Sequence, residues 1–501
     1  MGRMDPAELH ALRDVRAALT QLDGREPSDS RSPAINLHGD ATWWRGPFGV
    51  DDLAVSCVVA ALESLAVVVG RGRSTGADVE VDVDAAHASA MFWAEALVEP
   101  DGWAIPPVWD PIAGDYEGAD GWIRLHTNYA HHRTAALAAL GLPDSAATGR
   151  DQVAATVANH PVRALESAVI ERCGVAGASR SPQEWATSDA GAALAAEPLL
   201  AVDRTATTHV EHAHADPPPA ASLPAASLPA AFLPAAPLRG VRVLDLTRVL
   251  AGPTATGMLA AWGAEVLRID PVGFEEVPAV VPVMSAGKRT AALDLRDPAA
   301  RDRLDELVAS ADVVVHGYRG GALSGLGISS DRWHEQRPGL VEVSLDAFGW
   351  TGPWRTRRGF DSIVQHCVGI TTTAAEAVGA DRPTPLPCQA LDHGAGWLLA
   401  AAALRGLAAR RDTGTGSRWR TSLARVAALL TSIPGPVPLA RTPPTLDAVR
   451  ERCGAAAVVV AATDWGPLRR LAWPGTIDGA GPTMGGSGPL GRHLAAWSTD
   501  R

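Results

Sequence analysis

Cysteine and positive charge are both scarce in this chain. Five of its 501 residues are cysteine and none forms a CxxC pair, so neither a disulfide framework nor a zinc knuckle is predicted. We expect these cysteines to be buried thiols. The 44 Lys and Arg residues are outnumbered by 56 Asp and Glu residues, which gives a formal net charge of −12. This balance argues against a nucleic-acid partner, because binding to phosphates requires a basic surface.

Long apolar segments are missing as well. No run of about 18 uncharged apolar residues occurs, and the charged N-terminal segment MGRMDPAELHALRDVRAAL lacks the apolar core of a signal peptide. The composition, 47% hydrophobic and 20% charged, is that of a globular protein with about two to four domains. We therefore predict a cytoplasmic protein without a membrane partner.

A proline-rich segment divides the chain. Residues 204–238 contain the repeated sequence AASLP, and a proline at every fifth position blocks helix propagation and favours an extended chain. We interpret this segment as a linker between a first half, residues 1–203, and a second half, residues 239–501. A metal site in the linker is an alternative that its composition disfavours; its candidate ligands are His209, His212 and His214.

The two halves resemble each other. The 32 residues from Asp52 align without gaps on the 32 residues from Asp392, and a second pair, AVIERCG and AVRERCG, carries Trp185 onto Trp465. Two similar stretches so far apart predict two degraded copies of one domain rather than a solenoid. Chance similarity between alanine-rich helices is the alternative.

Only the second half is predicted to begin with an α/β unit. Val241–Leu246 has a strand pattern, a helix is expected from about Thr254, and a second strand is expected at Val266–Ile269. Further strands in DVVVHGY and LVEVSL predict a Rossmann-like parallel sheet. The first loop, TRVLAGPTATG, is not GxGxxG, so neither a nicotinamide nor a flavin cofactor is expected. Asp270 is interpreted as a strand-end residue.

Three blocks of the second half carry a family resemblance. The segments LRGVRVLDLTRVLAGPTATGMLAAWGAEVLRIDP, SAGKRTAALDLRDPAARDRLDELVASADVVVHGYRGGALSGLGI and SLDAFGWTGPWRTRRGFDSIVQ resemble the class III CoA-transferases, the carnitine and bile-acid (CaiB/BaiF) group. The resemblance covers Leu238 to about Leu430. More weakly, GADGWIRLHTNYAHHRTAALAALG and VAGASRSPQEW in the first half resemble the small domain of that family, which normally follows the α/β part.

This resemblance implies a fold and an assembly. The fold is a Rossmann-like large domain plus a small α+β domain, and the chain resembles a fused and trimmed pair of family members. Members of the family are usually interlocked homodimers. We therefore predict that the two halves pack together as a pseudo-dimer with one active site, while a homodimer stays open as an alternative.

The resemblance also implies a nucleophile, Asp392. Taken alone, this residue suggests an N-cap at the start of the helix that follows it. In the family, an aspartate at this position attacks the acyl-CoA thioester and forms first a mixed anhydride and then an aspartyl-CoA thioester, without a metal or a redox cofactor. We expect Gly394 and Gly396 to leave room for the thioester and free N–H groups of the helix to hold the oxyanion. Asp52, in the other copy, is expected to take no part.

The family resemblance also implies which residues contact coenzyme A, with Arg296 and Arg358 as partners of its phosphates. A solvated surface charge is the alternative for each arginine, and GYRGG at residues 317–321 departs from the family pattern. The residues implied to bind the cofactor are Val249, Leu250, Ala251, Leu293, Arg296, Tyr318 and Arg358. The acyl group is expected near Trp43–Trp44 and His126–His132, although core packing is the alternative for the tryptophans.

Two other functions stay open. An α-methylacyl-CoA racemase would place a histidine at position 360, where this chain has Phe360; His366 and His393 lie nearby but outside the motif position. A non-catalytic remnant that still binds coenzyme A is the second alternative. The partners implied by the main prediction are small molecules, an acyl-CoA and a carboxylic acid.

Overall fold

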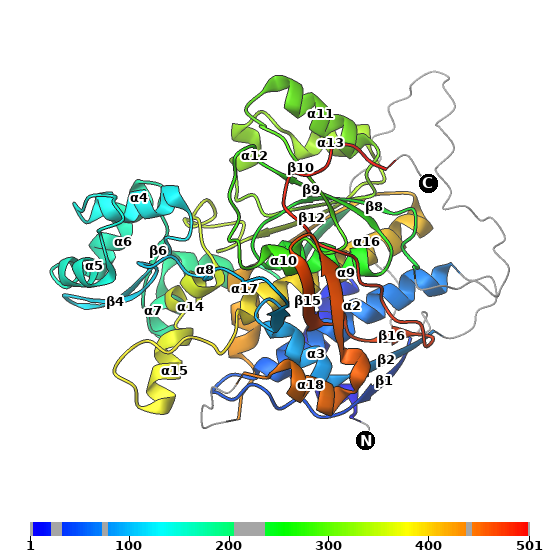
Figure 1. Cartoon of the computed structure of the whole chain (residues 1–501), viewed down its shortest axis with the longest axis horizontal. Coiled ribbons are helices and arrows are strands. Elements are labelled where there is room, and N and C mark those ends of the chain that lie inside the picture. Colours follow the sequence, from blue (N-terminus) through cyan, green and yellow to red (C-terminus); the bar gives the residue numbers. More distant parts are fainter. Residues whose placement is uncertain (1–3, 22–32, 73–78, 205–235, 437–442, 499–501) are drawn as a thin grey trace.

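The structure is a computed structural model that describes residues 4–21, 33–72, 79–204, 236–436 and 443–498 (Figure 1). Most of the predicted linker, including its three histidines, lies outside these residues.

A seven-stranded sheet forms the centre of the second half. Its order is β10-β9-β8-β11-β12-β13-β7, and every neighbouring pair is parallel except β13 and β7. The strands are β8 (Arg242–Leu246), β9 (Glu265–Asp270), β10 (Arg289–Ala292), β11 (Val313–His316), β12 (Val341–Asp346), β13 (Ser417–Ser422) and β7 (Ala201–Arg204). The sequence VVVH of β11 is buried at every position, as expected for a parallel strand covered on both faces. The predicted α/β fold with a parallel sheet is confirmed.

Helices cover both faces of this sheet. α9 (Ala251–Ala261) and α16 (Ala390–Thr413) belong to one hydrophobic cluster, whereas side chains of α11 (Pro298–Ala309) and α13 (Ser330–Gln336) belong to the cluster on the other face. α9 begins three residues earlier than expected, with Pro253 in its first turn, where the missing N–H of a proline costs little.

The longest helices of the two halves pack against each other. α16 lies between α9 and α2 (Val50–Arg71). Among the helices that the structure describes, α2 alone is long and apolar enough to cross a membrane by length and composition, and 83% of its most apolar stretch is buried inside the protein. Both helices are apolar on nearly all sides, as expected of helices buried in a core.

The first half contains an α/β unit of its own, so the expectation that only the second half has one is wrong. β1 (Ala34–His38) and β2 (Glu80–Asp84) are parallel and are joined through α2. Both strands are short. β2 reads EVDVD and buries its two valines, so it has the period-two alternation of a half-buried strand and was predictable from the sequence.

Each half completes a sheet of the other. β7, from the end of the first half, pairs antiparallel with β13, whereas β16 (Thr476–Ile477), near the end of the chain, pairs antiparallel with β2. A third sheet joins β3 (Val98–Pro100) of the first half to the hairpin β14 (Val458–Thr463) and β15 (Gly466–Leu471). The halves are therefore connected by backbone hydrogen bonds in three sheets.

A separate lobe, cyan in Figure 1, holds the small α+β unit of the first half. It consists of the sheet β4 (Gly114–Gly118), β5 (Gly121–Leu125) and β6 (Ala176–Ala178), covered by α4 (Ala130–Ala139), α5 (Arg150–Val157) and α6 (Val162–Glu171). This agrees with the expected small domain.

The second sequence similarity between the halves does not extend to its tryptophans. Trp185 is buried in α7 (Pro182–Thr187), whereas Trp465 lies in the turn between β14 and β15 and is 36% exposed. ERCG marks the end of α6 in one copy and the end of α18 in the other, so the similarity reflects two helix ends.

The remaining elements are short. They are η1 (Pro6–Glu8), α1 (His10–Leu19), α3 (Ala85–Ala90), η2 (Met91–Trp93), α8 (Asp189–Ala195), α10 (Val281–Met284), α12 (Ala322–Gly325), α14 (Asp361–Cys367), α15 (Ile370–Val378), α17 (Leu423–Thr431), α18 (Leu446–Cys453) and η3 (Ala455–Ala457).

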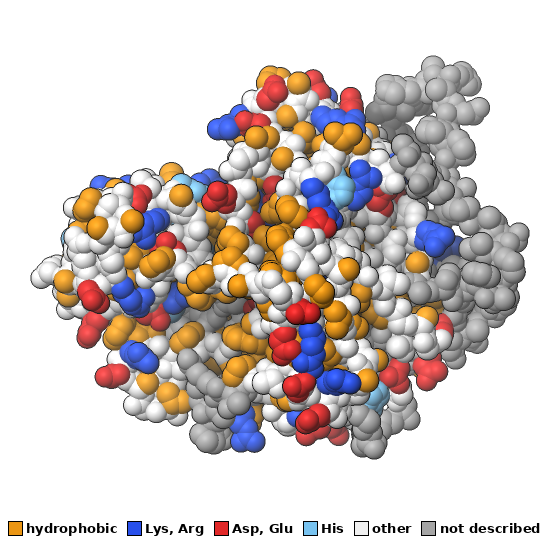
Figure 2. Space-filling model, viewed as in Figure 1, with side chains coloured by type: hydrophobic (Ala, Val, Ile, Leu, Met, Phe, Trp, Pro, Cys, Tyr) orange, Lys and Arg blue, Asp and Glu red, His pale blue; other side chains and the backbone are white. Residues whose placement is uncertain are grey.

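The surface over β15 and α18 carries acidic and basic side chains next to one another (Figure 2). There Arg469 pairs with Glu99 of β3 at 2.6 Å and with Asp447 of α18 at 2.5 Å. The cysteines are free; Cys173 is exposed and Cys453 is partly exposed, so the expectation of buried thiols fails for these two.

Candidate functional site

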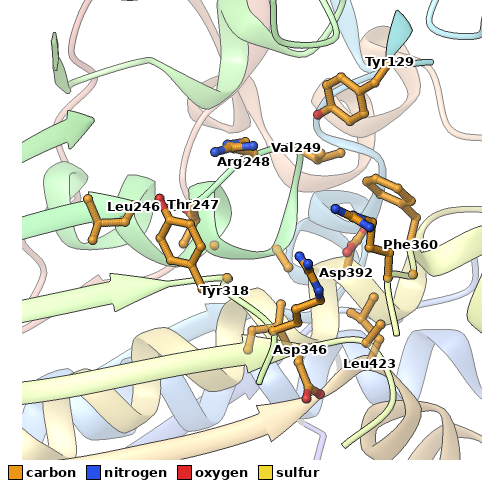
Figure 3. Close-up of a pocket in the computed structure, with 18 of the residues that line it drawn as sticks. Tyr129, Leu246, Thr247, Arg248, Val249, Tyr318, Asp346, Phe360, Asp392 and Leu423 are labelled. Carbon is orange, nitrogen blue, oxygen red and sulfur yellow. The ribbon is translucent and has the colours of Figure 1, made fainter. Parts of the chain in front are cut away.

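A pocket of about 330 Å³ lies at the carboxyl ends of the parallel strands and is lined by both halves. This is the usual ligand position in an open α/β sheet. Tyr129, His131 and His132 of the first half form one wall. Five of the predicted site residues line the pocket, and Figure 3 labels three of them, Val249, Tyr318 and Asp392; the five are Val249, Ala251, Tyr318, Arg358 and Asp392.

The other predicted contacts lie outside the lining. Leu250 is buried beside it and Leu293 packs on the far hydrophobic cluster. The side chain of Arg296 is 80% exposed and forms an ion pair with Asp294 at 2.7 Å. The pocket therefore does not bring these three residues together with Asp392.

Asp392 is the third residue of α16 rather than its N-cap, which is Gln389. The carboxylate that satisfies the helix start is Asp361, whose Oδ2 accepts hydrogen bonds from the backbone N–H groups of Leu391 (2.8 Å) and Asp392 (3.0 Å). The N-cap interpretation is therefore wrong. The two N–H groups are also not free, so the expectation that they hold an oxyanion is wrong for them.

The two carboxyl groups are electrostatically coupled. Burial raises the pKa of Asp361 to about 6, and hydrogen bonds from Gln365 and from the helix N–H groups oppose this rise. Burial, together with the charges of Asp361 and Glu95, raises the pKa of Asp392 well above its ordinary value. Because Asp361 has the better hydrogen bonds, it ionises first and Asp392 keeps the proton.

The glycines after Asp392 contact helices rather than the pocket, which corrects the expectation that they make room for a thioester. A Cβ on Gly396 would lie 2.5 Å from the carbonyl oxygen of Ala251 and 2.8 Å from Thr254 in α9. A Cβ on Gly394 would lie 3.0 Å from Val426. The glycines therefore permit close helix packing around the N-terminus of α16.

His393 points away from the pocket lining and toward the first half. Its Nε2 lies 2.8 Å from Oε2 of Glu95, and its ring stacks on Phe92 with centroids 5.6 Å apart. A sequence search for charge pairs could not have found this contact, because the two residues are 298 positions apart.

Phe360 lies next to Asp392 in the pocket (Figure 3). Its ring stacks on His126 of the first half. The ring centroids are 3.8 Å apart and the rings are nearly parallel. Trp44, by contrast, is buried in the main core and donates a hydrogen bond to the carbonyl of Ser89. Of the two clusters expected near the acyl group, His131 and His132 reach the pocket and His126 lies behind Phe360, whereas the tryptophans pack in the core.

Val249 has a strained backbone. Its φ of +62° is rare for a β-branched residue. Its N–H donates a hydrogen bond of 2.9 Å to the buried carboxylate of Glu276. The same carboxylate pairs with Arg268 at 2.8 Å and accepts a hydrogen bond of 2.7 Å from the hydroxyl of Tyr129. One carboxylate thus fixes the pocket loop and connects it to the first half.

Arginines supply the positive charge of the pocket. Arg248, Arg319 and Arg358 line it, and none of them forms an ion pair with an acid in the part of the chain that the structure describes. Arg357 also lines it, but its guanidinium pairs with Glu166 of the first half at 2.8 Å. The prediction included Arg358 but missed Arg248, which lies in the loop directly after the first strand, where a phosphate ligand is expected.

Beneath this loop lies Lys288, the single lysine of the sequence. Burial lowers its pKa to about 8, and it pairs with Asp245 at 3.1 Å. Among the described residues, no group of three or more His, Cys, Asp or Glu side chains could hold a metal ion.

Comparison with known proteins identifies the second half. The model described as CoA-transferase family III matches residues 238–445. This part of the chain belongs to CoA-transferase family III. The resemblance seen in the sequence is thereby confirmed for this part of the chain.

Individual relatives extend the match beyond this part of the chain. An acyl-CoA transferase of Gibberella moniliformis is 28% identical over 75% of this chain and 68% of its own length. The matched 75% of this chain is longer than the second half alone, so the similarity extends into the first half. The probable fatty acyl-CoA transferase Rv3272 of Mycobacterium tuberculosis is 32% identical over 38% of this chain, which spans about half (51%) of that relative. A crystal structure of Rv3272 matches at 31% identity with a TM-score of 0.36, over 40% of this chain and 58% of the other.

Proposed function

We propose that this protein transfers coenzyme A from an acyl-CoA to a carboxylic acid, with Asp392 as nucleophile. The observation that carries the proposal is a buried carboxyl group in a pocket that also holds three arginines without acid partners among the described residues. CoA brings several phosphate charges, which such arginines can bind by charge-assisted hydrogen bonds.

In the proposed reaction, the Asp392 carboxylate attacks the thioester carbonyl and the CoA thiolate leaves, which gives a mixed anhydride. The thiolate then attacks Cγ of Asp392 and releases the donor acid, leaving an aspartyl-CoA thioester. The acceptor carboxylate attacks this thioester, and the returning thiolate forms the new acyl-CoA and frees Asp392. Each step exchanges one acyl bond for another, so electrons and atoms balance without another reactant.

The strained loop at Val249, with Ala251 and Tyr318, is proposed to hold the adenosine end of CoA, and Arg248, Arg319 and Arg358 its phosphates. Contacts from Leu250, Leu293 and Arg296 stay predictions, since these residues lie outside the pocket lining. A cytoplasmic location also stays a prediction.

We further propose that one chain forms a pseudo-dimer with a single site around Asp392. The reciprocal strands β7 and β16 support this arrangement, as do Tyr129, His131 and His132 in the pocket wall. In the first copy, the carboxylate of Asp52 accepts hydrogen bonds from the N–H groups of His10 (2.8 Å) and Ala11 (3.0 Å), which suits a structural role. The boundaries 1–203, 204–238 and 239–501 remain part of this proposal.

The test compares Asp392→Ala with Asp52→Ala. During turnover with an acyl-CoA, mass spectrometry should find CoA, or hydroxamate after hydroxylamine treatment, on Asp392 in the native protein only. We expect Asp392→Ala to lose transfer completely and keep its fold. Asp52→Ala should stay active and lose about 1 kcal/mol of stability, because α1 loses its cap. Equal loss of activity in both variants would contradict the proposal that Asp392 is the nucleophile and Asp52 only stabilises the fold.

The racemase alternative is weaker because Phe360 occupies the position of the second acid-base group and His126 lies behind its ring, outside the pocket lining. Turnover in D2O separates the functions. A racemase would incorporate deuterium at the α-carbon, whereas the proposed transferase leaves that carbon unlabelled. A non-catalytic remnant would bind CoA but give neither labelled carbon nor modified Asp392.

A further inference from the structure

One buried histidine of the pocket lacks a hydrogen-bond partner in the protein. His132, the third residue of α4, is 3% exposed and lines the pocket. Its side chain forms no hydrogen bond within the part of the chain that the structure describes, and its Nδ1 is closed off from solvent. Five other buried histidines each place a ring nitrogen 3.1 Å or less from a protein oxygen, namely His87, His316, His334, His366 and His393. Because buried polar groups in native proteins are almost always paired, this imidazole indicates a contact that a ligand supplies.

The orientation of the His132 ring is fixed by its neighbours. Four rings contact it at centroid distances from 4.1 to 6.2 Å, and these rings belong to His131, Tyr129, Phe360 and His126. All four lie at a steep angle to the imidazole, between 60° and 83°. The ring is therefore held in place before a substrate arrives, so a hydrogen bond from it requires little reorganisation.

The imidazole of His132 is uncharged at neutral pH. Burial lowers its pKa to about 3, with smaller contributions from His131 and Arg358. A neutral imidazole has one N–H donor and one acceptor nitrogen. Because unpaired buried N–H groups are rarer than unpaired acceptors, we assign the proton to Nε2 and the acceptor to the enclosed Nδ1. A group with so low a pKa is a poor general base at neutral pH, and its N–H is suited to donate a hydrogen bond.

The proposed transfer needs such a donor. When a carboxylate attacks a thioester, negative charge develops on the carbonyl oxygen, and a preorganised N–H stabilises it. The backbone N–H groups of Leu391 and Asp392 both donate to Asp361. Phe360 lies next to Asp392 in the pocket (Figure 3), and its ring centroid is 5.9 Å from that of His132. A thioester carbonyl bound beside the Phe360 ring can therefore meet both Asp392 and His132.

We infer that His132 is a catalytic residue whose Nε2–H donates a hydrogen bond to the carbonyl oxygen of the acyl group as negative charge develops there. This inference rests on the proposed CoA transfer and adds the oxyanion donor, which comes from the first half of the chain. No proton leaves His132. The hydrogen bond strengthens while the carbonyl electron pair moves to oxygen and weakens when the carbonyl re-forms as the thiolate or the acid departs.

The test compares two substitutions of His132. His132→Leu removes the donor, whereas the side-chain amide of His132→Gln places an N–H close to the position of Nε2. Formation of the CoA thioester on Asp392 is followed by mass spectrometry in a single turnover with acyl-CoA, and binding of free CoA is measured by calorimetry. We expect the thioester to form about 100-fold more slowly in His132→Leu, with the Kd for CoA changed less than about threefold, and about tenfold or more of the rate to return in His132→Gln.

His160 provides the matched control. It lies between α5 and α6 of the same lobe, outside the pocket lining, so His160→Leu should form the thioester at the native rate. Denaturant unfolding of the His132 variants separates catalysis from folding. Because no protein hydrogen bond is lost, His132→Leu should be at least as stable as the native protein. If it does not fold, His132→Asn replaces it, since its shorter amide does not reach the position of Nε2 and the thioester should again form slowly.

Three results would overturn the inference while the native protein still acquires CoA on Asp392. They are a native rate in His132→Leu, a weaker binding of CoA at an unchanged rate, and an equal loss of rate and stability in the Leu and Gln variants. An unmodified Asp392 in the native protein would overturn the proposed transfer as well.

Discussion

The chemistry of the site depends on two aspartates that meet although they are 31 positions apart. Asp361 accepts hydrogen bonds from the N–H groups at the start of α16, whereas the side chain of Asp392 lines the pocket. Burial and the charge of Asp361 raise the pKa of Asp392 well above its ordinary value, so the nucleophile stays protonated at a pH where a free carboxyl group would be ionised. Asp361 therefore positions the helix and also limits the reactive fraction of Asp392.

Replacement of Asp361 by Asn tests this coupling. Its amide oxygen can still accept from the helix, but the negative charge next to Asp392 is gone, so the pKa of Asp392 falls. Activity should rise with pH in both proteins, because the ionised carboxylate is the nucleophile, and the rising limb should lie at lower pH in Asp361→Asn. The measurement is kcat/KM for acyl-CoA from pH 5 to 9.

An exposed acid serves as the control for that experiment. Asp381 is exposed and lies outside the pocket lining, so Asp381→Asn should leave the profile where it is. If Asp361→Asn lowers activity uniformly without moving the limb, Asp361 acts through structure alone and the electrostatic account is wrong.

At this scale the sequence predicted the residue that faces the pocket but not its surroundings. Asp392, Val249, Ala251, Tyr318 and Arg358 were found through family motifs. The partners of Asp392 could not be predicted, because Glu95 comes from the other half and Asp361 reaches α16 only after the chain has folded back.

At the scale of elements, the placement of Asp392 depends on how closely α16 approaches its neighbours. Gly396 faces the first residues of α9, and Gly394 faces Val426 of α17 and Leu53 of α2. The N-termini of α9 and α16 both border the pocket. A side chain between them would separate the loop at Val249 from Asp392.

The two glycines make a matched pair of variants. In Gly396→Ala the new Cβ meets a backbone oxygen at 2.5 Å, which cannot move without shifting α9, so we expect a loss of about 1–3 kcal/mol and a raised KM for acyl-CoA. In Gly394→Ala the contact of 3.0 Å is with the end of a valine side chain, so the loss should be smaller. Denaturant unfolding and steady-state kinetics measure both. Equal effects, or a milder Gly396→Ala, would contradict the packing argument.

Elements with a strong apolar pattern were predictable and weakly patterned ones were not. β8, β9, β11 and β12 follow apolar runs, and their parallel arrangement was predicted. β1 buries one position of five and β16 has two residues, so neither shows a period, whereas β2 has the alternation of a half-buried strand and could have been predicted.

At the scale of the molecule, the halves are held by more than surface contact. β7 and β16 each extend a sheet of the opposite half, and β3 extends the β14–β15 hairpin. Side-chain contacts near the site add Tyr129 to Glu276 and Glu166 to Arg357. The sequence predicted that the halves associate, but the exchanged strands follow from three-dimensional pairing that no local pattern encodes.

Cleavage between the halves tests this organisation. A protease site placed within residues 217–235 would cut the chain outside the described residues and leave all these contacts in place. Separation would expose three sheet edges, remove the Tyr129 hydroxyl from Glu276 and leave the buried Arg357 without the Glu166 carboxylate. Breaking such a buried charge pair costs on the order of several kcal/mol. We therefore expect both fragments to elute together in gel filtration, bind one CoA per pair and keep transferase activity. A cut chain whose fragments separate freely, with residues 239–501 fully active alone, would make the first half an accessory domain.

Arg357→Ala is the matched variant for this experiment. It removes the ion pair between Arg357 and Glu166 and leaves Glu166 paired with Arg180 at 2.6 Å. Because the loss of this pair weakens the association of the halves, the cleaved variant should dissociate at a lower urea concentration than the cleaved native protein.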